Sequence, residues 1–145
     1  MNIQYLTLKD FEYICDEVLK FFKNNQDPPP NYKSSYFDKL DSVIAIPRKT
    51  FFFTDLYPTL FDKTACYLYF INKLHPFDNG NKRTSIVATG TFLKLNGYEL
   101  TLSEDLMYKF AISVTISKRD QREYLKSIAA FIKINSKKKG QKFVL

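Results

Sequence analysis

Residues 75–83 read His-Pro-Phe-Asp-Asn-Gly-Asn-Lys-Arg and join two segments with helical patterns. Residues 58–74, which precede this stretch, are apolar almost all round, as expected for a helix enclosed by other helices. Residues 81–96, which follow it, have small side chains in their middle and end at Gly97, a frequent helix stop. The sequence therefore predicts a buried helix, a polar loop and a helix at the centre of a bundle.

Four more helices are predicted around this pair. Thr7 and Asp10 form a capping box before an amphipathic helix over residues 7–24, and a short helix is expected over residues 35–45. Ser103 caps a helix to about residue 117, and a last helix follows residues 117–120. The residues expected to face inward in the second helix are Phe37, Leu40, Val43 and Ile44. The apolar residues of the fifth helix are Leu106, Met107, Phe110, Ile112 and Val114.

No internal repeat and no alternating strand pattern accompanies these helices, so the predicted fold class is all-α with about six helices. The 145-residue chain has no break in composition, which predicts a single domain over residues 1–145. Charged or amide side chains interrupt every apolar run before about 18 residues, and the first residues do not resemble a secretion signal. Cys15 and Cys66 are flanked by apolar residues, which favours buried, reduced thiols and a cytoplasmic protein.

The net charge of +7 favours acidic partners in general. Much of this excess lies in a basic tail from about residue 135 to 145, which we interpret as a solvated end of the chain. The other basic residues are scattered and form no known nucleic-acid motif, so a nucleic-acid partner is not expected.

The loop itself has the features of an anion site. His75, the chain's single histidine, stands where the buried helix ends. The N-terminus of the next helix offers unpaired backbone N–H groups and a positive dipole end, which attract phosphate. Gly80 permits a tight turn, while Lys82 and Arg83 place two cations at a helix end that disfavours them unless an anion is bound. Phe77 is expected to anchor the loop in the core.

This stretch resembles the Fic/Doc family signature, which is His, any residue, Phe, any residue, Asp or Glu, Gly or Ala, Asn, Gly or Lys, Arg. Six matching positions make a chance occurrence on the order of one in a million by average composition. Lys82 is similar to the death-on-curing (Doc) branch, and the helical pattern is similar to a Doc toxin over about residues 5–134. The resemblance implies a Fic/Doc helical bundle with a short extended flap.

The resemblance also implies roles for individual residues. His75 would be the general base that takes a proton from a hydroxyl group of a target protein. Asn81 and the adjacent backbone would form an anion hole, Lys82 and Arg83 would hold the phosphates of ATP, and Gly80 would allow the bend. Glycine replaces Lys82 in the Fic branch, which transfers AMP.

Lys82 therefore favours a protein kinase that phosphorylates a Ser or Thr hydroxyl, with translation factors as the substrate class that the family suggests. AMP transfer from the same pocket and a catalytically weak binding module are the alternatives. The chain lacks the family's self-inhibitory segment, which predicts control by a separate antitoxin whose segment folds on binding.

One position departs from the signature. Asn79 stands where the family has the acidic residue that holds Mg²⁺, and Asp78 lies one place earlier. Because magnesium prefers carboxylate and phosphate oxygens, the ion is held weakly, or Asp78 replaces the missing ligand, or activity is reduced. These alternatives stay open at the level of the sequence.

Residues 48–54 are rich in Thr and aromatic side chains and are predicted to be extended. They lie where the resemblance places a flap that docks the target segment by strand addition, with Thr50, Phe51, Phe52 and Phe53 as its residues. The alternative is that the three phenylalanines fill the core beneath the loop.

Overall fold

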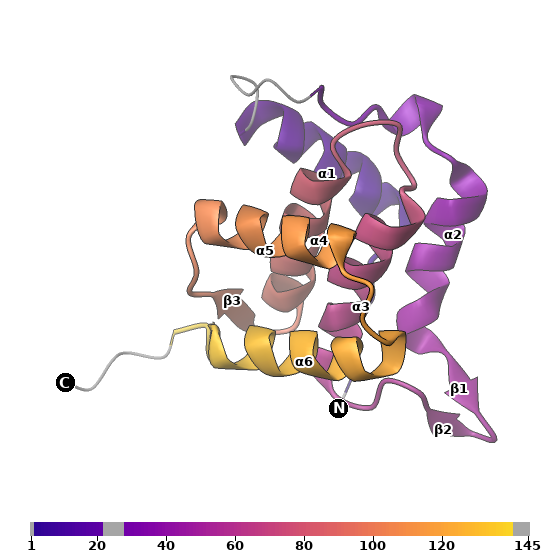
Figure 1. Ribbon diagram of the computed structural model, residues 1–145, viewed down its shortest axis with the longest axis vertical. Coiled ribbons are helices and arrows are strands. Elements are labelled where there is room, and N and C mark those ends of the chain that lie inside the picture. Colours follow the sequence, from indigo (N-terminus) through magenta and orange to yellow (C-terminus); the bar gives the residue numbers. More distant parts are fainter. Residues whose placement is uncertain (1, 22–27, 141–145) are drawn as a thin grey trace.

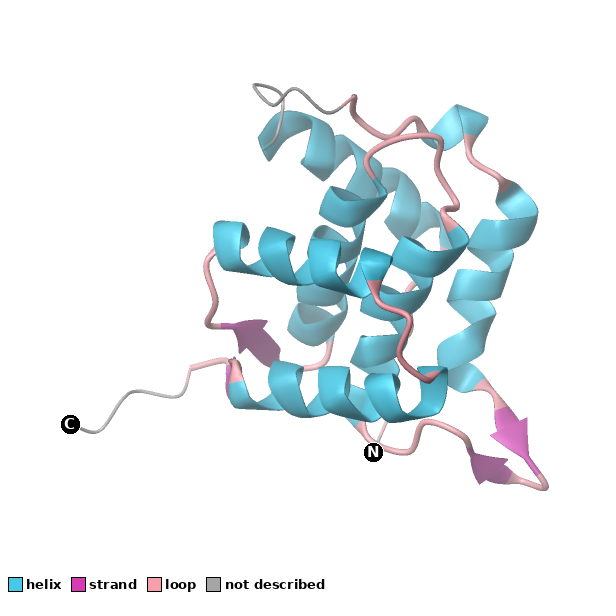
Figure 2. Ribbon diagram, viewed as in Figure 1, coloured by secondary structure: helices cyan, strands magenta, loops and turns pink. Residues whose placement is uncertain are grey.

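The computed structural model describes residues 2–21 and 28–140, which fold into a helical bundle with two small β-ribbons (Figures 1 and 2). The helices are α1 Leu8–Phe21, α2 Phe37–Ala45, α3 Leu60–Leu74, α4 Asn81–Leu95, α5 Glu104–Ile116 and α6 Gln121–Ile134. The strands are β1 Thr50–Phe51, β2 Thr54–Asp55, β3 Tyr98–Leu100 and β4 Ser136–Lys138, and 3-10 turns lie at Tyr32–Ser34 (η1) and Ile46–Arg48 (η2). The all-α prediction is confirmed.

Helices α3 and α4 form the middle of the bundle. α3 packs against α2, α4, α5 and α6, and α4 also packs against α1 and α5. α3 begins at a capping box, because the Thr59 hydroxyl accepts from the Asp62 N–H and the Asp62 carboxylate accepts from the Thr59 N–H. This cap moves the helix start two residues beyond the predicted position.

The predicted capping box of α1 is confirmed. The Asp10 carboxylate accepts from the Thr7 N–H at 2.8 Å, and the Thr7 hydroxyl accepts from the Asp10 N–H at 3.2 Å. Residues 22–24 of the predicted helix lie outside the described residues. Cys15 and Cys66 are buried free thiols, as predicted, and burial raises the pKa of Cys15 to about 12.

One prediction about inward-facing residues is wrong. Phe37 is exposed, because it is the first residue of α2, a helix that reaches the core with only one face. α2 buries Leu40 and Val43, three residues apart, and α5 buries Met107, Ala111 and Val114.

The basic tail is ordered in part, because its first residues form β4, whereas Lys138 and Lys139 are exposed, as the interpretation of a solvated end expects. β4 pairs with β3 in antiparallel register, with Glu99 opposite Lys137. The Lys137 ammonium lies 3.4 Å from the Glu99 carboxylate. Residues 141–145 of the predicted tail lie outside the described residues.

Residues 48–54 do not form one extended run. Arg48 closes η2, and β1 and β2 form a hairpin in which Phe51 pairs with Thr54. Phe52 and Phe53 form its turn, with φ of 49° and 64°. All three phenylalanines are exposed, so the alternative that they fill the core is wrong.

Candidate functional site

The loop between α3 and α4 begins at His75, whose left-handed backbone ends α3. His75 has φ 53° and ψ 65°, and its N–H donates to the Ile71 carbonyl at 3.2 Å. Phe77, two residues later, is buried in the core. The Asn81 side chain closes the loop, because its amide oxygen accepts from the Phe77 N–H at 3.1 Å and its amide nitrogen donates to the Phe77 carbonyl at 2.8 Å.

Asn81 therefore shapes the loop directly, a role that its predicted place in an anion hole did not include. An amide nitrogen has two N–H donors, and one of them is used in the bond to Phe77.

Two separate constraints require glycine at position 80. Its φ of 75° is the left-handed conformation that glycine adopts without a side-chain clash. A Cβ atom at this position would lie 2.6 Å from Cδ of Pro30. The segment with Pro29 and Pro30 therefore covers the turn that starts α4.

The motif residues line one cavity of about 270 Å³ at the N-terminus of α4. His75, Asp78, Asn79, Gly80, Asn81, Lys82 and Arg83 contribute to its wall, together with Pro28 and Tyr108. The Arg83 guanidinium lies over the Tyr108 ring, 4.3 Å from its centre. Sequence reasoning missed Tyr108, because it comes from α5 and carries no local signal in a helix full of apolar residues.

Electrostatics favour neutral His75. Partial burial lowers the pKa of its imidazole first, and the positive charges of Lys82, Lys39 and Lys73 lower it further. A neutral imidazole accepts a proton, so this environment keeps His75 in the form that a general base needs at neutral pH.

The candidate metal ligands, Asp78 and Asn79, are both exposed at the cavity wall. The Tyr36 hydroxyl donates to the Asp78 carboxylate, and this hydrogen bond is the main cause that raises the pKa of Tyr36. Within residues 2–21 and 28–140, no group of three or more His, Cys, Asp or Glu side chains is arranged to hold a metal. One carboxylate and one amide fit a magnesium ion that takes its other ligands from nucleotide phosphates and water.

The structure does not bring the predicted flap to this cavity. β1 and β2 come before the first residue of α3, and His75 comes after its last residue. Figure 1 shows the hairpin and the loop from α3 to α4 at opposite ends of α3. A helix of 15 residues is about 22 Å long. Thr50, Phe51, Phe52 and Phe53 therefore lie at the opposite end of α3 from the motif, and their role in docking a target stays a prediction.

The sequence model of the Fic/DOC family matches residues 5–93, which is more than half of the chain and includes the whole loop. The chain belongs to the Fic/DOC family. It is also similar to Toxin Doc of Mycolicibacterium smegmatis, with 40% identity over 78 residues. That match spans 50% of this chain and 60% of the relative.

Among the helices that the structure describes, none has both the length and the hydropathy that crossing a bilayer requires.

Proposed function

We propose that this Fic/DOC protein is a toxin that transfers the γ-phosphoryl group of ATP to a Ser or Thr hydroxyl of a cellular protein. The observation that carries the proposal is the cavity at the N-terminus of α4, which collects His75, Lys82 and Arg83. A hydroxyl donor, a proton acceptor and a phosphate cradle are the parts that phosphoryl transfer needs.

In the proposed reaction, the neutral His75 imidazole takes the proton of the target hydroxyl. The hydroxyl oxygen forms a bond to the γ-phosphorus, and the bond from this phosphorus to the bridging oxygen breaks, which releases ADP. Lys82, Arg83 and the first N–H groups of α4 offset the negative charge on the phosphates. Magnesium, held by Asp78 and Asn79, would neutralise phosphate charge.

The size of the cavity supports a phosphate site. Its volume of about 270 Å³ is below the range of about 300–1,000 Å³ that is typical of small-molecule pockets. We infer that the phosphates occupy it and that the nucleoside lies outside its mouth. Lys82 at the second position of α4 favours γ-phosphoryl transfer over AMP transfer.

The test is label transfer from ATP in a cell extract, with His75→Ala as the inactive control. γ-labelled ATP should label a protein and α-labelled ATP should not, and mass spectrometry of the labelled band checks whether it is a translation factor. Label from α-labelled ATP would show AMP transfer despite Lys82. If neither label were transferred, the result would support the alternative that the chain is a catalytically weak binding module.

The His75→Ala control must fold to be informative. His75 is exposed, so we expect its free energy of unfolding to change by no more than about 1 kcal/mol. A fully active alanine variant would exclude this loop as the catalytic site.

We also propose an antitoxin partner that masks the cavity, as a protein similar to Toxin Doc suggests. The net charge of +7 favours an acidic segment. Co-expression with the product of the neighbouring gene should relieve growth arrest, and the two chains should co-purify. A chain that is harmless alone and binds no neighbour would contradict the toxin assignment.

A further inference from the structure

The tip of the β1–β2 hairpin has a backbone that its side chains disfavour. Phe51 pairs with Thr54, so Phe52 and Phe53 are the two turn residues, and both have positive φ. Two-residue hairpin turns with two positive φ values strongly prefer Asn-Gly or similar pairs. Bulky L residues are unfavourable in this conformation. Phe52 and Phe53 therefore stand at turn positions whose backbone conformation disfavours phenylalanine.

The three aromatic side chains are also left in water. Phe51, Phe52 and Phe53 are 63%, 82% and 103% exposed, and we call this group the phenylalanine finger. Leu56, beside it, is exposed as well. An unfavourable turn that carries an exposed apolar cluster indicates a binding role. Burial of the aromatic side chains in a complex would contribute free energy that offsets the cost of the turn conformation.

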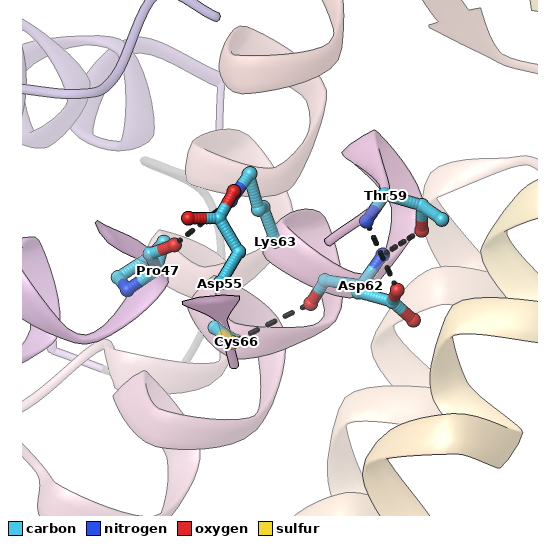
Figure 3. A network of polar contacts seen from close by, with 6 residues as sticks. All are labelled: Pro47, Asp55, Thr59, Asp62, Lys63 and Cys66. Atoms are coloured by element: carbon cyan, nitrogen blue, oxygen red, sulfur yellow. Dashed lines mark hydrogen bonds and ion pairs between the residues drawn. The ribbon is translucent and has the colours of Figure 1, made fainter. Parts of the chain in front are cut away.

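The base of the finger is fixed to α3. The Leu56 N–H donates to the Lys49 carbonyl at 3.0 Å, which continues the hairpin. The buried Lys63 ammonium lies 3.5 Å from the Asp55 carboxylate and donates to the Pro47 carbonyl at 3.3 Å (Figure 3). An element that is already ordered loses less conformational freedom on binding. The finger is therefore presented in a defined direction.

A cavity of about 470 Å³ begins at Leu56, the residue that follows the β1–β2 hairpin. Leu56, Tyr57 and Pro58 before α3 and Leu125 from α6 form its apolar walls, and Asp62, Gln121, Arg122 and Lys126 are its polar lining residues. Figure 1 shows the hairpin projecting from the molecule near the start of α6. Apolar walls accept aromatic rings, and the cations of Arg122 and Lys126 suit the faces of those rings.

We propose that two copies of this chain form a symmetric dimer, in which the phenylalanine finger of each copy enters this cavity of the other. A finger and a cavity that adjoin on one surface make a self-complementary patch, as a two-fold interface requires. The His75 loop lies at the other end of α3, so both candidate active sites stay open to a target.

The area is sufficient for a stable dimer. A phenylalanine side chain buries about 150–250 Å², so one finger at the observed exposures offers roughly 500 Å². Two fingers together offer roughly 1,000 Å², and the partner surface that they cover adds to this total, which brings the contact into the range of about 1,200–2,000 Å² that specific interfaces bury.

The test is sedimentation velocity on the full chain at about 10–100 µM, a range that covers the weaker affinities of interfaces of this size. The wild type should be a dimer. The double variant Phe52→Asn/Phe53→Gly keeps the hairpin, because Asn-Gly suits its turn, and should weaken dimerisation at least tenfold with an unchanged circular dichroism spectrum. Ile134→Gln, which removes an exposed apolar side chain at the far end of α6, should leave the dimer intact.

Mixing distinguishes finger-in-cavity contact from other dimers. The double variant Arg122→Glu/Lys126→Glu should also weaken dimerisation, because it replaces two cations that suit the negative faces of the aromatic rings by two carboxylates that those faces repel. Mixed with the finger variant, it should form a heterodimer through one intact finger and one intact cavity.

Three results would overturn the proposal. They are a monomeric wild type at about 100 µM, a dimer that survives the finger substitutions, and a mixture that stays monomeric. If the chain were monomeric and its finger bound the protein that is labelled in the cell extract, the hairpin would be assigned to substrate docking instead.

Discussion

At the residue scale, Gly80 provides a sharp test of the loop geometry. Gly80→Ala adds a Cβ atom 2.6 Å from Cδ of Pro30 at a φ of 75°. Left-handed backbone costs about 1–2 kcal/mol for a residue with a side chain, and the clash adds to that value. We expect the free energy of unfolding in urea to fall by at least about 1–2 kcal/mol.

Gly90, inside α4, is the control for Gly80, which precedes this helix as its N-cap. A Cβ atom there meets no atom within 4 Å, apart from the helix backbone and chain neighbours. Gly90→Ala should raise stability by about 0.5–1 kcal/mol, because alanine restricts the unfolded chain and favours helix. Equal losses at Gly80 and Gly90 would contradict the described approach of Pro30 to Gly80.

His75 gives a second prediction at this scale. Its pKa lies below the ordinary value of 6.5 through partial burial and then Lys82, Lys39 and Lys73. The proposed base is active when neutral, so the transfer rate should fall with decreasing pH only below 6.5. Because His75 is the single histidine, its NMR titration is unambiguous.

Lys39→Met tests the cause of this shift. Removal of one positive charge should raise the His75 pKa and move the acid limb of the rate profile to higher pH. Lys9→Met, on α1, is the control and should leave both unchanged. An unshifted His75 titration in Lys39→Met would show that this lysine does not act on the imidazole.

At the element scale, a buried polar link joins α3 to α4 next to the loop. The Asn72 amide donates to the Ser85 hydroxyl at 2.8 Å, and this hydroxyl donates to the Lys82 carbonyl at 2.6 Å. The Asn72 and Ser85 side chains are both buried. If one of them is removed, bulk water cannot replace the hydrogen-bond partner that the other loses.

Ser85→Ala should therefore lower the free energy of unfolding by about 1–3 kcal/mol, measured in urea. Ser113→Ala is the control, because this exposed hydroxyl bonds only within its own helix and should change stability by less than about 0.5 kcal/mol. If both variants lost the same small amount, the link between α3 and α4 would not contribute to stability.

At the scale of the whole molecule, Asn96 ties the N-terminal segment to the end of α4. Its amide oxygen accepts from the Gln4 N–H at 2.9 Å, and its amide nitrogen donates to the Gln4 carbonyl at 3.0 Å. Asn96→Ala should speed hydrogen exchange at the Gln4 amide and lower stability by about 1 kcal/mol.

Asn135→Ala is the control for this link, since its side chain donates to the carbonyl of Phe131 in the preceding helix. It should leave exchange at Gln4 unchanged. Slow exchange at Gln4 in the Asn96 variant would mean that other contacts hold the N-terminal segment.

The helices and the loop were open to prediction because their signals are local. Thr7 and Asp10 cap a helix three residues apart, Gly97 ends one, and residues 75–83 hold the motif in one continuous stretch. Residues that are three or four positions apart in a helix contact each other independently of the tertiary structure. The family assignment rests on the same continuity.

Contacts between segments that are distant in the sequence could not be predicted from local patterns. Pro30 against Gly80, Tyr108 under Arg83 and Lys137 beside Glu99 each join residues that no local pattern relates. The position of the β1–β2 hairpin at the opposite end of α3 from the loop that leads into α4 is also set by packing (Figure 1). Folding sets such pairs by packing whole elements against one another, because many weak contacts across the core outweigh the preference of any single residue.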